Sequence, residues 1–129
     1  MKAKKILVVE DDKVTQTLIS NTLKAAGYEV FTADDATSAV KIAREEEPDL
    51  ITLDILLPID SPDETWDGFN VAGWVRRLKP GSKTPAIIVI SGMEPDKALK
   101  KAAAVGVYSF LPKPIEKANL LKVVAAALK

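Results

Sequence analysis

The sequence predicts an α/β fold, in which a doubly wound parallel sheet carries helices on both faces. Two observations support this prediction. Short apolar runs rich in β-branched residues recur along the 129 residues, and segments with helical spacing of apolar side chains separate them. Continuous apolar runs are typical of parallel strands that are buried on both faces, whereas half-exposed strands alternate. The chain therefore repeats a strand-then-helix unit five times.

Five segments are expected to form the strands. Residues 6–9, 50–53 and 86–90 are continuous apolar runs of central strands, whereas 28–33 alternates more, as an edge strand does. A shorter run at 108–111 is the last strand. With right-handed crossovers and helices on both faces, the expected strand order is 2-1-3-4-5, that of flavodoxin-like folds.

Five helices are expected after these strands. The first follows Asp12, which can cap it, and ends at about residue 26, before Gly27. The second begins after Asp34 or Asp35 and ends before Pro48. The third begins near residue 67, the fourth spans about 95–105, and the fifth follows residue 114. The apolar face of the first helix is expected to comprise Val14, Leu18, Ile19, Leu23 and Ala26.

Composition limits the classes of function. A chain of this length, with 47% hydrophobic and 28% charged residues, fits one globular domain. The 18 basic and 18 acidic residues balance, so direct binding to nucleic acid or to an anionic membrane is not expected. Cysteine and histidine are absent, which excludes thiolate and imidazole chemistry. The first apolar run is too short for a signal peptide or a membrane insertion, and the expected compartment is the cytoplasm.

Acidic residues follow the two strands that should be neighbours in the centre of the sheet. Glu10 and Asp11 come directly after the first strand, and Asp54 comes directly after the third. Three ionised carboxylates close together raise one another's pKa unless a cation lies between them. Oxygen ligands without nitrogen or sulfur favour a hard ion, which is Mg²⁺ or else Ca²⁺ or Mn²⁺.

Two further polar residues follow the fourth and fifth strands. Ser91 offers a hydroxyl group, and Lys113 offers a fixed positive charge. A phosphoryl group in transfer spreads negative charge over three oxygens, which a metal ion, an ammonium and a hydroxyl can stabilise. Asp54 as nucleophile would become an aspartyl phosphate. Each residue taken alone could simply cap a turn or face solvent, but four strand ends with matched chemistry favour the functional interpretation.

Four motifs together resemble those of a two-component response-regulator receiver domain, over essentially the whole chain. They are ILVVEDD at 6–12, LDILLP at 53–58, VISG at 89–92 and FLPKP at 110–114. The resemblance implies one receiver domain over residues 1–129 that acts as a phosphorylation-dependent switch. It implies self-catalysed phosphoryl transfer and slow autodephosphorylation rather than enzymatic turnover. Mg²⁺ is the implied cofactor, and a sensor histidine kinase or a phosphotransfer protein is the implied partner.

The resemblance also implies which residues perform each step. Asp54 would be the phosphoacceptor, and Lys113 would contact the phosphoryl group. Glu10 and Asp11 would be the acid pair that binds the metal together with Asp54, and the backbone carbonyl of Leu56 would be a further ligand.

The implied output involves two switch residues, the hydroxyl of Ser91 and the aromatic ring of Phe110. The fourth helix has few apolar residues to bury, so its packing could change at modest free-energy cost. The implied partner surface, which could also form a homodimer, comprises the fourth helix, the fifth strand and the fifth helix. A cis peptide bond between Lys113 and Pro114 is a further expectation from the resemblance.

The chain departs from the family pattern mainly at residues 59–66. Eight residues stand there, where two usually connect the proline of the phosphoacceptor motif to the next helix. The segment carries Asp60, Asp63, Glu64 and Trp66. It could be a packed spacer, a lid over the phosphorylation site or a recognition loop for the partner kinase.

Three other interpretations compete with a signalling switch. A phosphatase of the haloacid-dehalogenase type would need a second carboxylate two residues after its nucleophile, where this chain has Leu56. A flavin carrier would need a phosphate-binding loop after the first strand, where Glu10, Asp11 and Asp12 would repel a phosphate. A degenerate receiver that only binds a partner is disfavoured, because every reactive position is filled.

Overall fold

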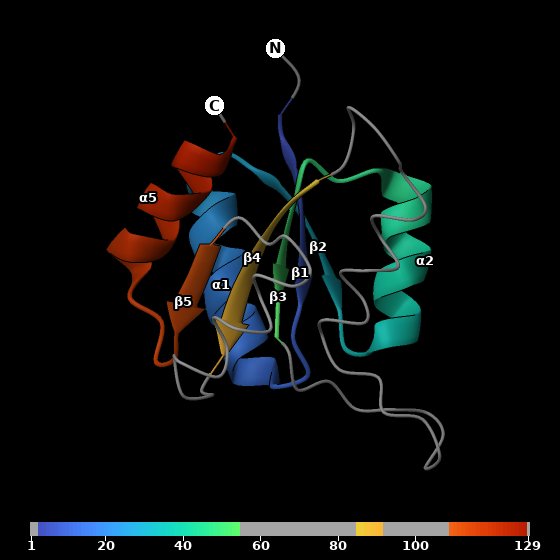
Figure 1. The fold of residues 1–129 in the computed structure, drawn as a ribbon, viewed down its shortest axis with the longest axis horizontal. Coiled ribbons are helices and arrows are strands. Elements are labelled where there is room, and N and C mark those ends of the chain that lie inside the picture. Colours follow the sequence, from blue (N-terminus) through green and yellow to red (C-terminus); the bar gives the residue numbers. More distant parts are fainter. Residues whose placement is uncertain (1–2, 55–84, 92–108, 129) are drawn as a thin grey trace.

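A computed structural model describes residues 3–54, 85–91 and 109–128 of the chain. Within these ranges five strands form one sheet of order β2-β1-β3-β4-β5, and every pairing is parallel (Figure 1). The predicted sheet order is therefore confirmed. The predicted third and fourth helices, the Leu56 carbonyl and segment 59–66 lie outside the described residues. No helix in the described ranges is long and apolar enough to cross a membrane.

The boundaries of the strands agree with the predicted ranges to within one residue. The strands are β1 (Lys5–Val9), β2 (Glu29–Ala33), β3 (Leu50–Leu53), β4 (Ala86–Ser91) and β5 (Ser109–Pro112). The described helices are α1 (Lys13–Ala25), α2 (Ala36–Glu46) and α5 (Lys117–Ala127). Figure 1 shows α1 and α5 on one face of the sheet and α2 on the other.

Alternate strand residues supply the two halves of the core, because successive side chains of a strand point to opposite faces. The half beneath α2 comprises Leu7, Val9, Ala33, Ile51, Leu53 and Ile87 from the strands, with Ala39 and Ala43 from the helix. The half beneath α1 and α5 comprises Ile6, Val8, Leu50, Ile88, Ile90 and Leu111 from the strands, with Ile19, Leu23, Leu120 and Val124 from the helices. Most of these side chains are fully buried, which explains why the strands read as unbroken apolar runs.

Side-chain caps fix where both N-terminal helices begin. The Asp12 carboxylate accepts a hydrogen bond from the Thr15 backbone N–H at the start of α1. Asp35, rather than Asp34, caps α2 by accepting from the Ser38 N–H at 2.8 Å. The Asp34 side chain is therefore available for other contacts.

The buried face of α1 differs from the predicted one. Val14 is 79% exposed, whereas the polar residues Gln16 and Ser20 are buried together with Ile19 and Leu23. In an α-helix, residues two positions apart in the sequence are separated by about 200° around the axis, so Val14 and Gln16 lie on opposite sides. The expectation that Val14 packs into the core is wrong because Gln16 occupies the face toward the sheet. Ala26, which is also expected on the buried face, is exposed at the C-cap of the helix.

Candidate functional site

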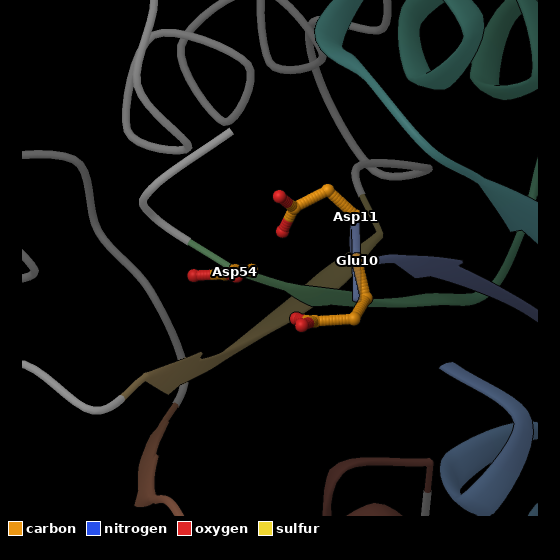
Figure 2. A group of neighbouring side chains, drawn as sticks. All are labelled: Glu10, Asp11 and Asp54. Atoms are coloured by element: carbon orange, nitrogen blue, oxygen red, sulfur yellow. The ribbon is translucent and has the colours of Figure 1, made fainter. Parts of the chain in front are cut away.

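The carboxyl ends of β1 and β3 bring three acidic side chains together. These strands are paired in parallel with Val9 opposite Leu53, and the Asp54 backbone N–H donates to the Val9 carbonyl at 2.9 Å. One carboxylate oxygen from each of Glu10, Asp11 and Asp54 lies within 4.8 Å of the others (Figure 2). The predicted clustering of these three residues is therefore confirmed.

The acidic cluster is buried on one side and open on the other. The Glu10 and Asp54 side chains are 2% and 7% exposed, whereas Asp11 is exposed. Burial of an ionised carboxylate is costly unless a positive charge or hydrogen-bond donors compensate it. The buried carboxylates therefore need a neighbouring positive charge or hydrogen-bond donors.

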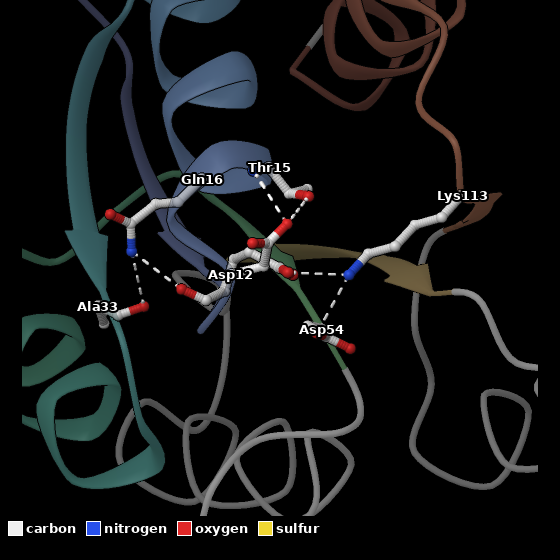
Figure 3. Close-up of polar contacts among 7 residues, drawn as sticks. Asp12, Thr15, Gln16, Ala33, Asp54 and Lys113 are labelled. Atoms are coloured by element: carbon white, nitrogen blue, oxygen red, sulfur yellow. Dashed lines mark hydrogen bonds and ion pairs between the residues drawn. The ribbon is translucent and has the colours of Figure 1, made fainter.

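Lys113 supplies part of this compensation from the end of β5. Its ammonium nitrogen lies 2.8 Å from Glu10 Oε1 and 3.3 Å from Asp54 Oδ2, and Figure 3 shows it reaching Asp54. The lysine side chain is 25% exposed, so the ion pair is largely shielded from solvent. The Lys113–Pro114 peptide bond is cis, as expected. The structure thus confirms that Lys113 points into the acidic cluster.

The electrostatics of the cluster favour a divalent cation. Burial raises the pKa of Glu10 to about 7; the hydrogen bond from Lys113 opposes this shift, and the proximity of Asp54 adds to it. Burial alone would lower the pKa of Lys113, but its hydrogen bond to Glu10 and the charges of both carboxylates outweigh burial and raise it. One ammonium therefore does not fully neutralise the site. Three converging carboxylates without nitrogen or sulfur ligands fit a hard ion such as Mg²⁺.

Of the other predicted site residues, the structure describes Ser91 and Phe110 but not Leu56. Ser91 is the last residue of β4, and its Cα is paired with that of Pro112 at the edge of the sheet where the acids lie. Phe110 is half-buried in β5, with Val89 opposite in β4. The switch roles of Ser91 and Phe110 remain predictions.

A polar network beside the cluster was not predicted from the sequence. The side-chain nitrogen of Gln16 donates to the Glu10 carbonyl at 2.9 Å and to Asp34 Oδ1 at 2.7 Å. Lys13 in turn binds both oxygens of Asp34, at 2.8 and 2.7 Å. No signal in the sequence pointed to this network, because the apolar pattern of the first helix did not place Gln16 toward the core.

A doubly wound sheet with acids and a lysine at its carboxyl edge defines a domain suited to accept a phosphoryl group. The family model described as the response regulator receiver domain matches residues 6–125. The chain belongs to this family. The suspected resemblance is thereby confirmed.

Two curated relatives are transcriptional regulators that are much longer than this chain. The alkaline phosphatase synthesis transcriptional regulatory protein PhoP of Bacillus subtilis is 43% identical over 76 residues, which are 59% of this chain and 29% of that protein. The DNA-binding transcriptional regulator NtrC of Azospirillum brasilense is 31% identical over 128 residues, which are 99% of this chain and 25% of that protein. The chain thus spans between 25% and 29% of the length of these relatives.

Solved receiver domains have the same fold. Chemotaxis protein CheY4 of Vibrio cholerae is 29% identical with a TM-score of 0.87, over 98% of this chain and all of that one. The receiver domain of sensor histidine kinase PA1611 from Pseudomonas aeruginosa is 27% identical with a TM-score of 0.83, over 98% of each chain. That structure has a magnesium ion coordinated in its active site cleft.

Proposed function

We propose that the chain is a signalling switch that accepts a phosphoryl group on Asp54 from a sensor histidine kinase or a phosphotransfer protein. The observation that carries the proposal is the Lys113 ammonium, which lies 3.3 Å from Asp54 and 2.8 Å from Glu10. It places a fixed positive charge beside the one acid that follows the third strand. The proposed receiver domain comprises residues 1–129, and its expected compartment is the cytoplasm.

In the proposed transfer, a carboxylate oxygen of Asp54 attacks the phosphorus atom of the donor. The bond from phosphorus to the donor breaks, its electron pair leaves with the donor, and an acyl phosphate bond forms. The hydrogen bond from the Asp54 backbone N–H to the Val9 carbonyl fixes the main chain of the nucleophile. Lys113 is close enough to transfer its contact from the carboxylate to a phosphoryl oxygen, where it offsets the added charge. Slow attack of water on the acyl phosphate would return the switch to its starting state.

Glu10, Asp11 and Asp54 are the described residues that would hold Mg²⁺, and the Leu56 carbonyl is the further ligand expected from the family. A bound Mg²⁺ would neutralise these carboxylates and stabilise charge on the transferring phosphoryl group. The magnesium ion in the Pseudomonas aeruginosa receiver domain supports this assignment.

The proposed output begins at Ser91 and Phe110. A phosphoryl group on Asp54 would attract the Ser91 hydroxyl, and Phe110 would turn inward as β5 repacks. The surface expected to change comprises the fourth helix, β5 and α5. This surface would bind a downstream target or a second copy of the chain.

The test is phosphorylation by a small donor. The protein is incubated with magnesium chloride and acetyl phosphate, and intact mass is expected to show one added phosphoryl group that hydroxylamine removes. Asp54→Asn should abolish the addition while the circular dichroism spectrum stays unchanged. Glu29→Gln, at an exposed acid on β2, is the control and should be labelled normally. Undiminished labelling of Asp54→Asn would contradict the assignment.

A further inference from the structure

Gln16 is a buried polar residue whose amide lies against the main chain of the acidic motif. The residue is 7% exposed and lies on the side of α1 that faces the sheet (Figure 3). Its side-chain nitrogen lies 2.9 Å from the Glu10 carbonyl, 2.7 Å from Asp34 Oδ1 and 3.4 Å from the Ala33 carbonyl. One side chain thus connects α1, the end of β1 and the end of β2.

The chemistry around this amide specifies a hydrogen-bond donor. Glu10, Ala33 and Asp34 present only acceptors toward it, and an amide nitrogen brings two hydrogens. The two shorter bonds, to Glu10 and Asp34, use both hydrogens. A carboxylate at position 16 would have no hydrogen to donate, so its oxygens would face the acceptor oxygens of Glu10, Ala33 and Asp34.

The bond to Glu10 fixes more than one residue. The Glu10 carbonyl belongs to the planar peptide unit that joins Glu10 to Asp11, so its direction sets the orientation of both residues. β1 ends at Val9, and beyond it the Glu10 N–H donates to the Ala33 carbonyl at 3.0 Å. Glu10 is therefore held through its N–H by β2 and through its carbonyl by Gln16.

Asp34 accepts the second of the two short hydrogen bonds from the Gln16 side-chain nitrogen. Lys13 binds both of its carboxylate oxygens, and the hydrogen bonds from Lys13 and then Gln16 lower the pKa of Asp34. Asp34 therefore remains an ionised acceptor at neutral pH. The Lys13 ammonium and the Gln16 amide thus share the Asp34 carboxylate as their acceptor.

We propose, as an extension of the proposed function, that Gln16 is a positioning residue for magnesium binding. Its amide sets the Glu10–Asp11 peptide so that both carboxylates converge with Asp54. Gln16 acts through the main chain and does not touch the ion. Partners of this kind commonly change metal affinity by about 10- to 100-fold when they are removed.

The experiment measures Mg²⁺ affinity of the unphosphorylated protein by isothermal titration calorimetry. Gln16→Met keeps the approximate shape but removes the donor, and the dissociation constant is expected to rise about 10- to 100-fold. At saturating Mg²⁺ the rate of phosphorylation by acetyl phosphate should return to within a few-fold of normal. Ser20→Ala is the matched control, because Ser20 is buried one turn further along the same helix face and should leave affinity unchanged.

Gln16→Glu tests the requirement for a donor. It keeps the length of the side chain and should weaken Mg²⁺ binding at least as much as Gln16→Met does. If Gln16→Met melts at a lower temperature but binds Mg²⁺ normally, Gln16 is only a structural residue and the proposal is overturned.

A second test of the proposal leaves the buried residue Gln16 unchanged. If Gln16→Met does not fold, Asp34→Ala removes the partly exposed partner of the amide and should weaken Mg²⁺ binding in the same direction. Unchanged affinity in Asp34→Ala would overturn the proposal. If the unsubstituted protein neither binds Mg²⁺ nor accepts a phosphoryl group, the proposed function fails as well. Normal behaviour of the unsubstituted protein with equal affinity in Gln16→Met refutes only the role of Gln16.

Discussion

Magnesium binding to the unphosphorylated protein is expected to weaken between pH 8 and pH 6. The responsible group is Glu10, whose pKa is raised by burial, and further by Asp54, from 4.5 to about 7. A carboxyl group must lose its proton before it can ligate a metal ion, so protons and Mg²⁺ compete for Glu10. Lys113 has a raised pKa and stays an ammonium throughout this range.

The magnitude follows from a single titration. A group with a pKa near 7 is about nine-tenths protonated at pH 6 and about one-tenth protonated at pH 8. The apparent dissociation constant for Mg²⁺ should therefore rise about tenfold from pH 8 to pH 6. At pH 7 each bound ion should release about half a proton.

The same pKa predicts how stability depends on pH without metal. The folded state binds the Glu10 proton more tightly than the unfolded state, so protonation stabilises the fold below about pH 4.5. This stabilisation is lost as pH rises to about 7, and after allowance for coupling to Asp54 and Lys113 it is on the order of 1–3 kcal/mol. Saturating Mg²⁺ should reverse the trend, since the ion then compensates the ionised carboxylate.

Calorimetry at pH 6, 7 and 8, in buffers of different ionisation enthalpy, gives both the affinity and the number of protons released. Glu10→Gln cannot titrate; its Mg²⁺ affinity should be lower and nearly constant over this range. A dissociation constant that does not change from pH 8 to pH 6 would refute the reasoning. A tenfold change that persists in Glu10→Gln would assign the titration to another group.

Two further predictions concern the core and the inserted segment. Leu120→Ala removes a fully buried side chain of α5 and should lower the free energy of unfolding by about 2–5 kcal/mol in urea titrations. Val14→Ala, at an exposed position, is the control and should change it by no more than about 0.5 kcal/mol. Equal effects of the two substitutions would contradict the burial pattern. Replacing 59–66 with a two-residue connection should speed both phosphorylation by small donors and spontaneous loss of the phosphoryl group if the segment is a lid. Unchanged rates with slower transfer from the cognate kinase would identify a recognition loop instead.

The sheet and the acidic cluster could be predicted because both follow from the order of the elements. Once β1 and β3 are neighbours, any residue directly after them must lie at the same edge, and this places Glu10, Asp11 and Asp54 together. Lys113 follows from the same argument at the end of β5. The predictable part of the site is therefore the part that depends only on strand ends.

The polar network depended on features that sequence patterns do not determine. The burial of Gln16 depends on how α1 is rotated against the sheet, and exposed Val14 shows that the apolar pattern alone gave the wrong rotation. Asp34 and Asp35 are equally good caps by residue type, and only the backbone geometry selects Asp35. The sequence does not indicate which groups a glutamine side chain will bond, so only the structure identifies the three acceptors of Gln16.

The ion pair between Glu10 and Lys113 joins residues that are 103 positions apart in the chain. During synthesis Glu10, Asp11 and Asp54 are added early, whereas Lys113, which pairs with Glu10 and Asp54, is added only after the fifth strand. A product that stops before residue 113 would carry the proposed phosphoacceptor Asp54 without the ammonium that partly compensates the acidic cluster. Under the proposed function, competence to accept a phosphoryl group would therefore be acquired late in biosynthesis.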